Sequence, residues 1–232
     1  MKKKSLVLFF LLPWISLFGD FQTGLTAYKA KDFVKAFQEW NPSAEKGDPL
    51  SQYFVGSLYF EGQGVEKNLE KALELWKKAA NQGHAGSQVT LGSLYFEGKL
   101  IPQNFQEAEK WYRKAAENGN YLAQFNLGLL YEDGKGVQLD YMESSQWFLK
   151  AAEQGYRNAL YKLVNYGFIF SNGIGVPADN VKAYQWYTLS AGEGNEKAAE
   201  LRDFISRQMT PAEIAQGKKM AEDWLKAHPG KK

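Results

Sequence analysis

Residues 116–137 read AENGNYLAQFNLGLLYEDGKGV, and elements of this stretch recur along the chain at a nearly constant interval. The first glycine of the stretch has counterparts at steps of 36, 36, 36 and 39 residues. These glycines are Gly47, Gly83, Gly119, Gly155 and Gly194. Self-similarity at a fixed period of roughly 20–50 residues is typical of stacked repeat architectures. The sequence therefore predicts one supersecondary unit that is copied along the chain.

Other columns of residues keep the same phase. Aromatic residues stand seven or eight positions before each glycine, and a small residue stands eleven positions before it. The aromatic columns are Trp40, Trp76, Trp111 with Tyr112, Trp147 with Phe148, and Trp186 with Tyr187; the small column is Ala36, Ala72, Ala108, Ser144 and Ala183. After each glycine a Gly-x-x-Tyr/Phe-x-x-Gly pattern follows, and the fourth copy reaches it only after three extra residues around 163–166.

Each unit is expected to form two helices. The copy at 120–155 places apolar residues at i, i+4, i+7 and i+8, which predicts a buried helix face. A Gly-x-Gly turn ends this helix, and Asp140 is a favourable N-cap for a second one. The residues expected to be buried are Ala123, Leu127, Leu130 and Tyr131 in the first helix and Trp147, Phe148, Ala151 and Ala152 in the second. Because two short helices cannot bury their apolar faces alone, neighbouring copies must share one core.

These residues resemble the Sel1-like repeat family, a relative of the tetratricopeptide repeat. The pattern Ala-x-x-Gly-x-x-x-Ala-Gln-x-x-Leu-Gly-x-x-Tyr-x-x-Gly-x-Gly-Val stands nearly whole at 116–137, and the resemblance covers roughly residues 20–208. It implies an all-α fold, a right-handed α-solenoid of helix-turn-helix repeats. Departures from the pattern lie in the fourth copy.

The repeat spacing also predicts the division of the chain. It gives an N-terminal partial repeat at 20–47, repeats at 48–83, 84–119, 120–155 and 156–194, and C-terminal capping helices with a tail at 195–232. Thr210 and Glu213 have the spacing of a capping box with Pro211 at the first helical position, which predicts a terminal helix to about Ala227. A solenoid needs such a helix to cover its open end.

The first 19 residues have the pattern of a signal peptide. Three lysines precede a mostly apolar run at 6–18, whose helix would rise only about 20 Å, short of the roughly 30 Å hydrocarbon core. We expect cleavage after Gly19 and a periplasmic or secreted protein with no stable membrane anchor; an uncleaved anchor is the alternative. Cleavage would change the net charge from +2 to −1, since 28 basic residues less three leaves 25 against 26 acidic ones.

The composition excludes several kinds of chemistry. The chain has no cysteine and two histidines, so cysteine-ligated metals and thiol catalysis are ruled out, and the near-neutral charge argues against a nucleic-acid partner. Ser43-x-x-Lys46 matches a serine β-lactamase motif, but Ser43 occupies a slot that holds alanine in other copies and its partner motifs are missing. His84 is more simply explained as a local cap than as a ligand. We expect no enzyme, no metal and no cofactor.

One surface feature remains. Positions 3, 6, 10 and 13 after each repeat glycine lie on the side of the first helix opposite its buried face, and they are unusually apolar. We call this set the stripe; its apolar members are Leu50, Tyr53, Phe60, Val89, Phe96, Leu122, Phe125, Leu129, Tyr161 and Phe168. By analogy with tetratricopeptide repeats, the stripe is expected on the concave, partner-binding face. The alternative is that part of it, above all Tyr53, Val89, Phe125 and Tyr161, packs between repeats.

The resemblance implies protein binding without catalysis. Small exported members of the family act as immunity partners that neutralise phospholipase effectors delivered by type VI secretion, and others act as periplasmic adaptors, scaffolds or signalling regulators that bind a periplasmic enzyme or another protein. A hydrolase on cell-wall or β-lactam substrates is the third reading. Binding through the stripe predicts that Tyr53→Ala or Phe125→Ala abolishes capture while melting stays near wild type.

Overall fold

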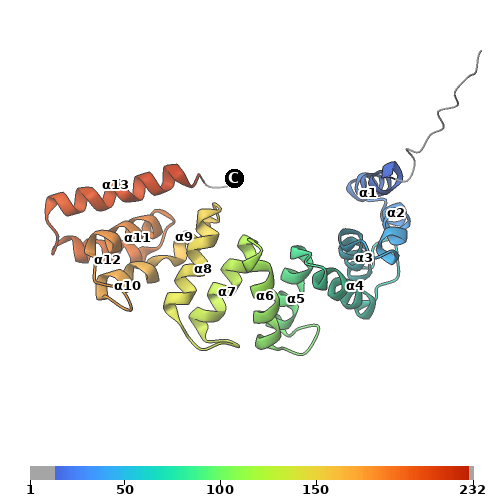
Figure 1. Cartoon of the computed structure of the whole chain (residues 1–232), viewed down its shortest axis with the longest axis horizontal. Helices are drawn as coiled ribbons and strands as arrows, with labels where there is room; N and C mark the ends of the chain where they lie inside the picture. The colour runs from blue at the N-terminus through green and yellow to red at the C-terminus, as the bar shows by residue number, and fades with distance from the viewer. Residues whose placement is uncertain (1–13, 230–232) are drawn as a thin grey trace, which may run out of the picture. The chain divides into compact units, whose positions relative to one another are not determined.

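The computed structural model describes residues 14–229, and side chains from residue 21 onward (Figure 1). These residues form α-helices joined by short loops, and the described part of the chain contains no β-strand. It divides into two compact units, an N-terminal unit that ends at Leu91 and a C-terminal unit that begins at Gly92.

The helices follow the predicted pairs. The N-terminal unit contains α1 (Trp14–Lys29), α2 (Phe33–Glu45), α3 (Pro49–Glu61) and α4 (Leu69–Asn81), and the boundary between the units falls within α5 (Ala85–Glu97). The C-terminal unit contains α6 (Phe105–Glu117), α7 (Tyr121–Asp133), α8 (Tyr141–Glu153), α9 (Arg157–Lys162), α10 (Val164–Asn172), α11 (Asn180–Gly192), α12 (Glu196–Ser206) and α13 (Pro211–Ala227).

Most of the expected signal peptide lies outside the described residues. Helix α1 begins at Trp14 and continues across Gly19, after which cleavage is expected. Within residues 14–229, no helix is both long and apolar enough to cross a membrane.

Short polar side chains begin the second helix of every repeat. Each of them is an N-cap whose side-chain oxygen accepts a hydrogen bond from a backbone N–H of the first turn. These caps are Asp32, Asn68, Asn104, Asp140 and Asp179. The repeat glycines that follow the second helices all have φ between +83° and +100°, a backbone conformation that an L side chain rarely adopts. The spacing that revealed the repeat is therefore a spacing of helix boundaries.

Glycines inside the first helices bring the two helices of a repeat into contact. A Cβ on Gly56 would lie 2.9 Å from the indole of Trp76, and one on Gly128 would lie 2.7 Å from the ring of Phe148. Loop glycines make a second close approach, to the preceding repeat. A Cβ on Gly136 would lie 2.5 Å from the backbone of Phe105 at the start of α6. These contacts leave no room for a side chain.

In the first helix of the copy at 120–155, the residues expected to be buried are buried, with the exception of Tyr131. Ala123, Leu127 and Leu130 are fully buried, whereas Tyr131 is half-buried. The hydroxyl of Tyr131 accepts a hydrogen bond of 2.6 Å from the Nη2 of Arg113, whose side chain is partly exposed. The prediction that Tyr131 is buried was therefore wrong, because this half-buried side chain reaches a partly exposed guanidinium.

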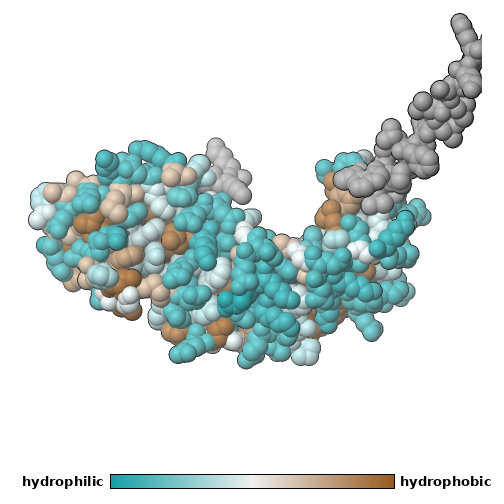
Figure 2. All heavy atoms as spheres, in the orientation of Figure 1, coloured by the Kyte–Doolittle hydropathy of each residue, from teal (hydrophilic) through white to brown (hydrophobic). Residues whose placement is uncertain are grey.

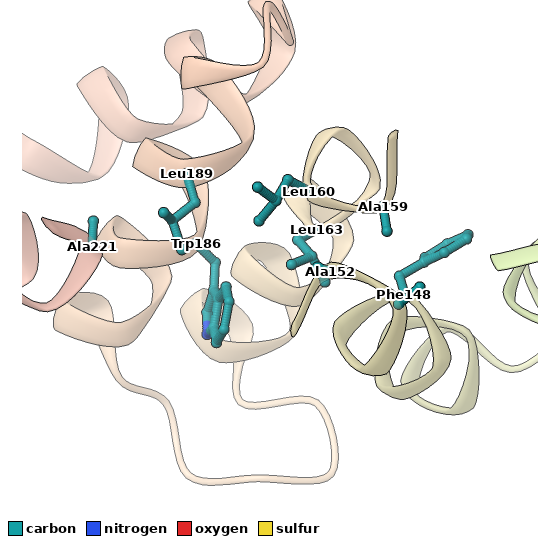
Figure 3. Packing of buried hydrophobic residues seen from close by; sticks show 9 residues of the cluster. Phe148, Ala152, Ala159, Leu160, Leu163, Trp186, Leu189 and Ala221 are labelled. Carbon is teal, nitrogen blue, oxygen red and sulfur yellow. The ribbon is translucent and has the colours of Figure 1, made fainter. Parts of the chain in front are cut away.

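The fourth copy has a broken first helix. Six residues of α9 and nine of α10 flank Leu163, so the pair spans 16 residues where α7 has 13. Leu160 and Leu163 still point into the core between α8 and α11, which they share with Phe148, Trp186 and Leu189 (Figure 3). The three inserted residues are absorbed by the break, and the core continues across it.

The terminal helix is confirmed. Thr210 and Glu213 form both hydrogen bonds of the capping box, Pro211 occupies the first helical turn, and α13 ends at Ala227. The helix packs on α11, with Ala221 entering the same core as Trp186 (Figure 3).

Candidate functional site

None of the ten stripe side chains is fully buried. Four of them are exposed by more than a third: Leu50 by 37%, Leu122 by 38%, Tyr161 by 44% and Phe168 by 49%. The other six are half-buried: Tyr53, Phe60, Val89, Phe96, Phe125 and Leu129. The stripe therefore combines open positions with positions that also support packing.

In the N-terminal unit, the stripe aromatics pack on rings of their own unit. The ring of Tyr53 lies 4.8 Å from that of His84, and Phe60 lies 5.4 Å from Trp76. The ammonium group of Lys67 lies over the ring of Phe60, at 5.8 Å from its centroid. Leu50 is the most open stripe residue of this unit.

In the C-terminal unit, Phe96 and Phe125 also have intramolecular partners. Phe96 packs on Phe105 at 5.6 Å, beneath the ammonium group of Lys135. Phe125 contacts the rings of Phe148 at 5.3 Å and Tyr156 at 5.1 Å. Truncation of Phe125 would remove both ring contacts, so Phe125→Ala is expected to lower stability and is a poor probe of binding alone.

A pocket of about 200 Å³ lies where α7 and α9 meet on the stripe. Phe125 and Tyr161 provide its aromatic walls. Its other lining residues are Arg157, Asn158, Lys162 and Glu193. The pocket brings together stripe residues of two successive first helices with charged residues that flank them.

The charged residues are arranged in two ion pairs. Arg157 donates to Glu193 through Nε and Nη2, both at 2.8 Å, and this pairing raises the pKa of the guanidinium further above its usual value. Lys162 donates to Glu132 at 2.7 Å, and Asn165 donates to the second oxygen of the same carboxylate at 2.9 Å. In each pair the cation is the more exposed partner.

The break in the fourth copy fixes the wall of this pocket. Because α9 ends at Lys162, the carbonyl of Tyr161 is available for bonds outside the helix, and it accepts from Ser190 Oγ at 2.6 Å and Asn195 Nδ2 at 2.8 Å. Ser190 and Asn195 are buried. The backbone beneath Tyr161 is thus anchored while its ring stays exposed.

The sequence-based stripe includes Phe125 and Tyr161, whereas the ion pairs were not predicted. Arg157 and Glu193 are 36 residues apart, and only the folded repeat places them side by side. A signal was available at the second position after each repeat glycine, which holds Pro49, Ala85 and Tyr121 in the earlier copies and the charged residues Arg157 and Glu196 after the last two glycines.

The other candidates have structural explanations. The Nδ1 of His84 accepts from the backbone N–H of Ser87 at 3.1 Å, which caps α5, as the local reading predicted. Ser43 lies in the last turn of α2, and Lys46 caps that helix through its backbone N–H. Within the described residues, no cluster of histidine and acidic side chains could hold a metal ion.

Two solved structures share more than a third of their aligned residues with this chain. A Sel1 repeat protein from Oxalobacter formigenes is 35% identical with a TM-score of 0.68, and the match covers 90% of this chain and 84% of that one. The protective antigen c5321 of uropathogenic Escherichia coli is 34% identical with a TM-score of 0.67, and the match covers 92% of this chain and 46% of that one. The chain thus spans less than half of the antigen's length.

The similarity to a further solved structure is weaker. The immunity protein Pa5087 from Pseudomonas aeruginosa is 22% identical with a TM-score of 0.45, over 94% of this chain and 82% of that one, and this likeness supports no argument about function. No curated protein matches the chain.

The family model agrees with the repeat phase. The Sel1 repeat model matches residues 49–84, 85–120, 122–156 and 163–195, which together make up more than half of the chain. The break at Leu163 falls where the fourth match begins. The all-α fold of helix-turn-helix repeats expected from the sequence is confirmed, and the chain belongs to the Sel1 repeat family.

Proposed function

We propose that this protein is a non-catalytic, protein-binding solenoid that acts outside the cytoplasm and captures one partner along the stripe of its C-terminal unit. The observation that carries the proposal is the exposure of Leu122, Tyr161 and Phe168 on successive first helices beside a mixed polar and aromatic pocket. Exposed aromatic and aliphatic side chains around a pocket are typical of the anchor points of protein interfaces.

The second helices differ from the stripe in the side chains that they expose. Over the second helices α6 and α8, Figure 2 shows mostly hydrophilic side chains on the face that it displays. The charged residues Lys110 and Lys150 lie over the tryptophan rings of their own helices. The exposed apolar residues Leu122, Tyr161 and Phe168 therefore favour the first helices as the binding elements. The proposed location outside the cytoplasm rests on the signal pattern of residues 1–19.

The partner is best captured and measured with paired triple variants. The triple Leu122→Ala, Tyr161→Ala and Phe168→Ala removes the exposed stripe residues of the C-terminal unit. The matched control is Leu139→Ala, Tyr141→Ala and Ile174→Ala, whose side chains are 46–50% exposed but lie outside the stripe. The partner is identified by affinity capture from periplasmic extract, purified, and titrated calorimetrically.

The stripe triple is expected to weaken binding at least about 100-fold, since hot-spot truncations cost about 2 kcal/mol or more, while the control stays within about threefold. Equal losses in both triples, or none in either, would overturn the proposal. Melting temperatures of both proteins show whether they remain folded.

The family resemblance implies two forms of this function. The protein is either an immunity protein against an exported phospholipase or a general periplasmic adaptor, scaffold or regulator. Co-expression with a phospholipase encoded beside this gene separates them. Immunity predicts that cells survive the effector only when the wild-type stripe is present, whereas an adaptor gives no protection.

A hydrolase is the remaining alternative. It predicts turnover of nitrocefin or of peptidoglycan fragments by the purified protein and loss of that turnover in Ser43→Ala. Our proposal predicts no turnover in either protein.

A further inference from the structure

We propose that the pocket between α7 and α9 is a receptor for an acidic side chain next to an apolar one, on an extended segment of the partner protein. This inference rests on the proposed function, because it specifies the chemistry of the partner that the stripe would bind. It assigns the partner's acidic group to Arg157 and Lys162 and its apolar neighbour to Phe125 and Tyr161.

The size of the pocket favours a piece of polypeptide. Sites for drug-sized molecules and cofactors usually enclose about 300–1,000 Å³. At about 200 Å³ this pocket is smaller, and it lies on an open row of apolar residues. One or two side chains of a segment that follows the row would fit these dimensions.

The exposed polar groups of the pocket are mainly donors. The side chain of Arg157 is 67% exposed whereas that of Glu193 is 14% exposed, and Lys162 is 31% exposed whereas Glu132 is 18% exposed. The acids are therefore recessed behind the cations that they bind.

Each cation keeps donors for a ligand. Arg157 uses Nε and Nη2 on Glu193, which leaves both N–H groups of Nη1, and Lys162 uses one of its three N–H groups on Glu132. The amide of Asn158 donates to the hydroxyl of Tyr156 at 3.1 Å and keeps its second N–H. Donors of charged groups favour a carboxylate, because charge-assisted hydrogen bonds are about twice as strong as neutral ones.

The receptor is held in place before a ligand arrives. Bidentate pairing orients the guanidinium of Arg157, and the carboxylate of Glu132 holds both Lys162 and Asn165. Ser190 and Asn195 anchor the carbonyl of Tyr161. Such preorganisation lowers the entropic cost of binding, so a small pocket can act as an anchor point.

The first experiment measures the ligand preference directly. N-acetyl-Phe-Glu-amide and its neutral isostere N-acetyl-Phe-Gln-amide are titrated into the ¹⁵N-labelled protein, and amide chemical shifts are followed. We expect the acidic peptide to shift resonances of α7 and α9 and to bind at least about fivefold more tightly than the neutral one. Equal affinities, shifts located elsewhere, or no shifts with either peptide would overturn the inference.

The second experiment exchanges the charges. The double variant Arg157→Glu with Glu193→Arg keeps an ion pair but places the carboxylate at the exposed position. It is expected to lose the preference for the acidic peptide and to bind N-acetyl-Phe-Lys-amide better than wild type does. Lys110→Gln, which removes an exposed, ion-paired cation of α6 outside the pocket, is the matched control and should change nothing. An unchanged preference in the exchanged variant would contradict the assignment.

The two proposals fail in different ways. If the purified partner loses affinity for the Leu122, Tyr161 and Phe168 triple but binds the charge-exchanged protein as well as wild type, the pocket assignment is wrong and the binding function stands. If neither variant affects the partner, the proposed function fails as well. Wild-type melting of the exchanged variant shows that it remains folded.

Discussion

The two units meet the same packing requirement with different aromatic side chains. In the N-terminal unit, Trp40 and Trp76 each cover a glycine of the first helix, and each indole N–H donates at 3.1 Å to a backbone carbonyl one turn earlier. In the C-terminal unit the corresponding residues are Tyr112, Phe148 and Tyr187, which cover their glycines in the same manner.

The difference lies in the polar atom of the ring. The hydroxyls of Tyr112 and Tyr187 lie 3.0 and 3.2 Å from serine hydroxyls of the first helices, and Phe148 has no polar atom to satisfy. The close approach at glycine is thus the shared requirement, while the hydrogen bond varies from copy to copy. We expect the free energy of unfolding to depend strongly on the close approach at glycine and more weakly on the hydrogen bond of the ring.

Filling the glycine contact should produce the largest effect. Gly128→Ala would place a methyl group 2.7 Å from Phe148, and Gly56→Ala would place one 2.9 Å from Trp76. Overpacking of a core usually costs about 1–3 kcal/mol. We expect Gly56→Ala to cost about 1 kcal/mol more than Gly128→Ala, because a displaced indole also loses its hydrogen bond. Urea denaturation followed by circular dichroism measures both.

Gly192 at the end of α11 provides the control. A Cβ there meets no atom within 4 Å. Gly192→Ala should therefore stabilise the protein by about 0.5–1 kcal/mol through helix propensity alone. If Gly56→Ala and Gly128→Ala behaved like Gly192→Ala, the close approach would not be the shared requirement.

Removing the polar atom of the ring should cost less. Trp76→Phe loses the bond to the carbonyl of Tyr53 together with part of the ring, so we expect a loss of about 1–2 kcal/mol. Tyr112→Phe loses only the bond to Ser93, for which we expect about 0.5–1.5 kcal/mol. Equal costs for the two variants would contradict the distinction between the units.

The ionisation of Tyr112 offers a separate readout. Burial raises the pKa of Tyr112 to about 12, so absorbance at 295 nm should show one tyrosine that ionises only near that pH. Because the folded pKa lies above the unfolded value of about 10, this contribution to stability is complete below pH 10 and is lost as the pH rises toward 12.

A small-residue position distinguishes copies within the C-terminal unit. Ser144 is fully buried in α8, and its hydroxyl has no hydrogen-bond partner, whereas Ala108 and Ala183 occupy the same slot in other second helices. Ser144→Ala should raise the free energy of unfolding by about 1 kcal/mol, because an unpaired buried hydroxyl is removed. A loss of stability would indicate that this hydroxyl has a partner in solution.

The smallest effect concerns the first-helix caps. His84 caps α5 in the N-terminal unit where Asn120 caps α7 in the C-terminal unit. Burial lowers the pKa of His84, although the charge of Asp48 partly opposes this shift. Because the folded pKa lies below the unfolded value of 6.5, the stabilisation is complete above pH 6.5 and is lost as the pH falls through the folded value.

The expected loss is at most about 1 kcal/mol, the usual contribution of a cap. Thermal melts at pH 7.5 and pH 5 measure it, with His84→Asn as the variant in which this part of the pH dependence should disappear. The same slope in wild type and His84→Asn would mean that another group titrates.

The helix boundaries could be predicted because they depend on local chemistry. Gly119, Asp140 and Thr210 act through the backbone of their own turns, so spacing alone identified them. The pocket could not be predicted, because Arg157 and Glu193 meet only after two repeats have stacked. Phe96 shows the same limit, since its helical angle placed it on the stripe without revealing that Phe105 and Lys135 cover it.

The second glycine of a loop packs toward the preceding repeat, so the contact between repeats is directional along the chain. A side chain on Gly136 would collide with Phe105 of the preceding repeat, whereas at the next loop a Cβ on Gly175 would meet only the terminal methyl of Met142, at 3.6 Å. The loops at Gly64 and Gly136 thus pack tightly on the start of the preceding second helix, and the loop at Gly175 packs on it more loosely. A repeat module excised for protein engineering should therefore include its loop glycine and the start of the helix that this glycine contacts. The loop at Gly175, with its looser contact, is the best place to insert another repeat.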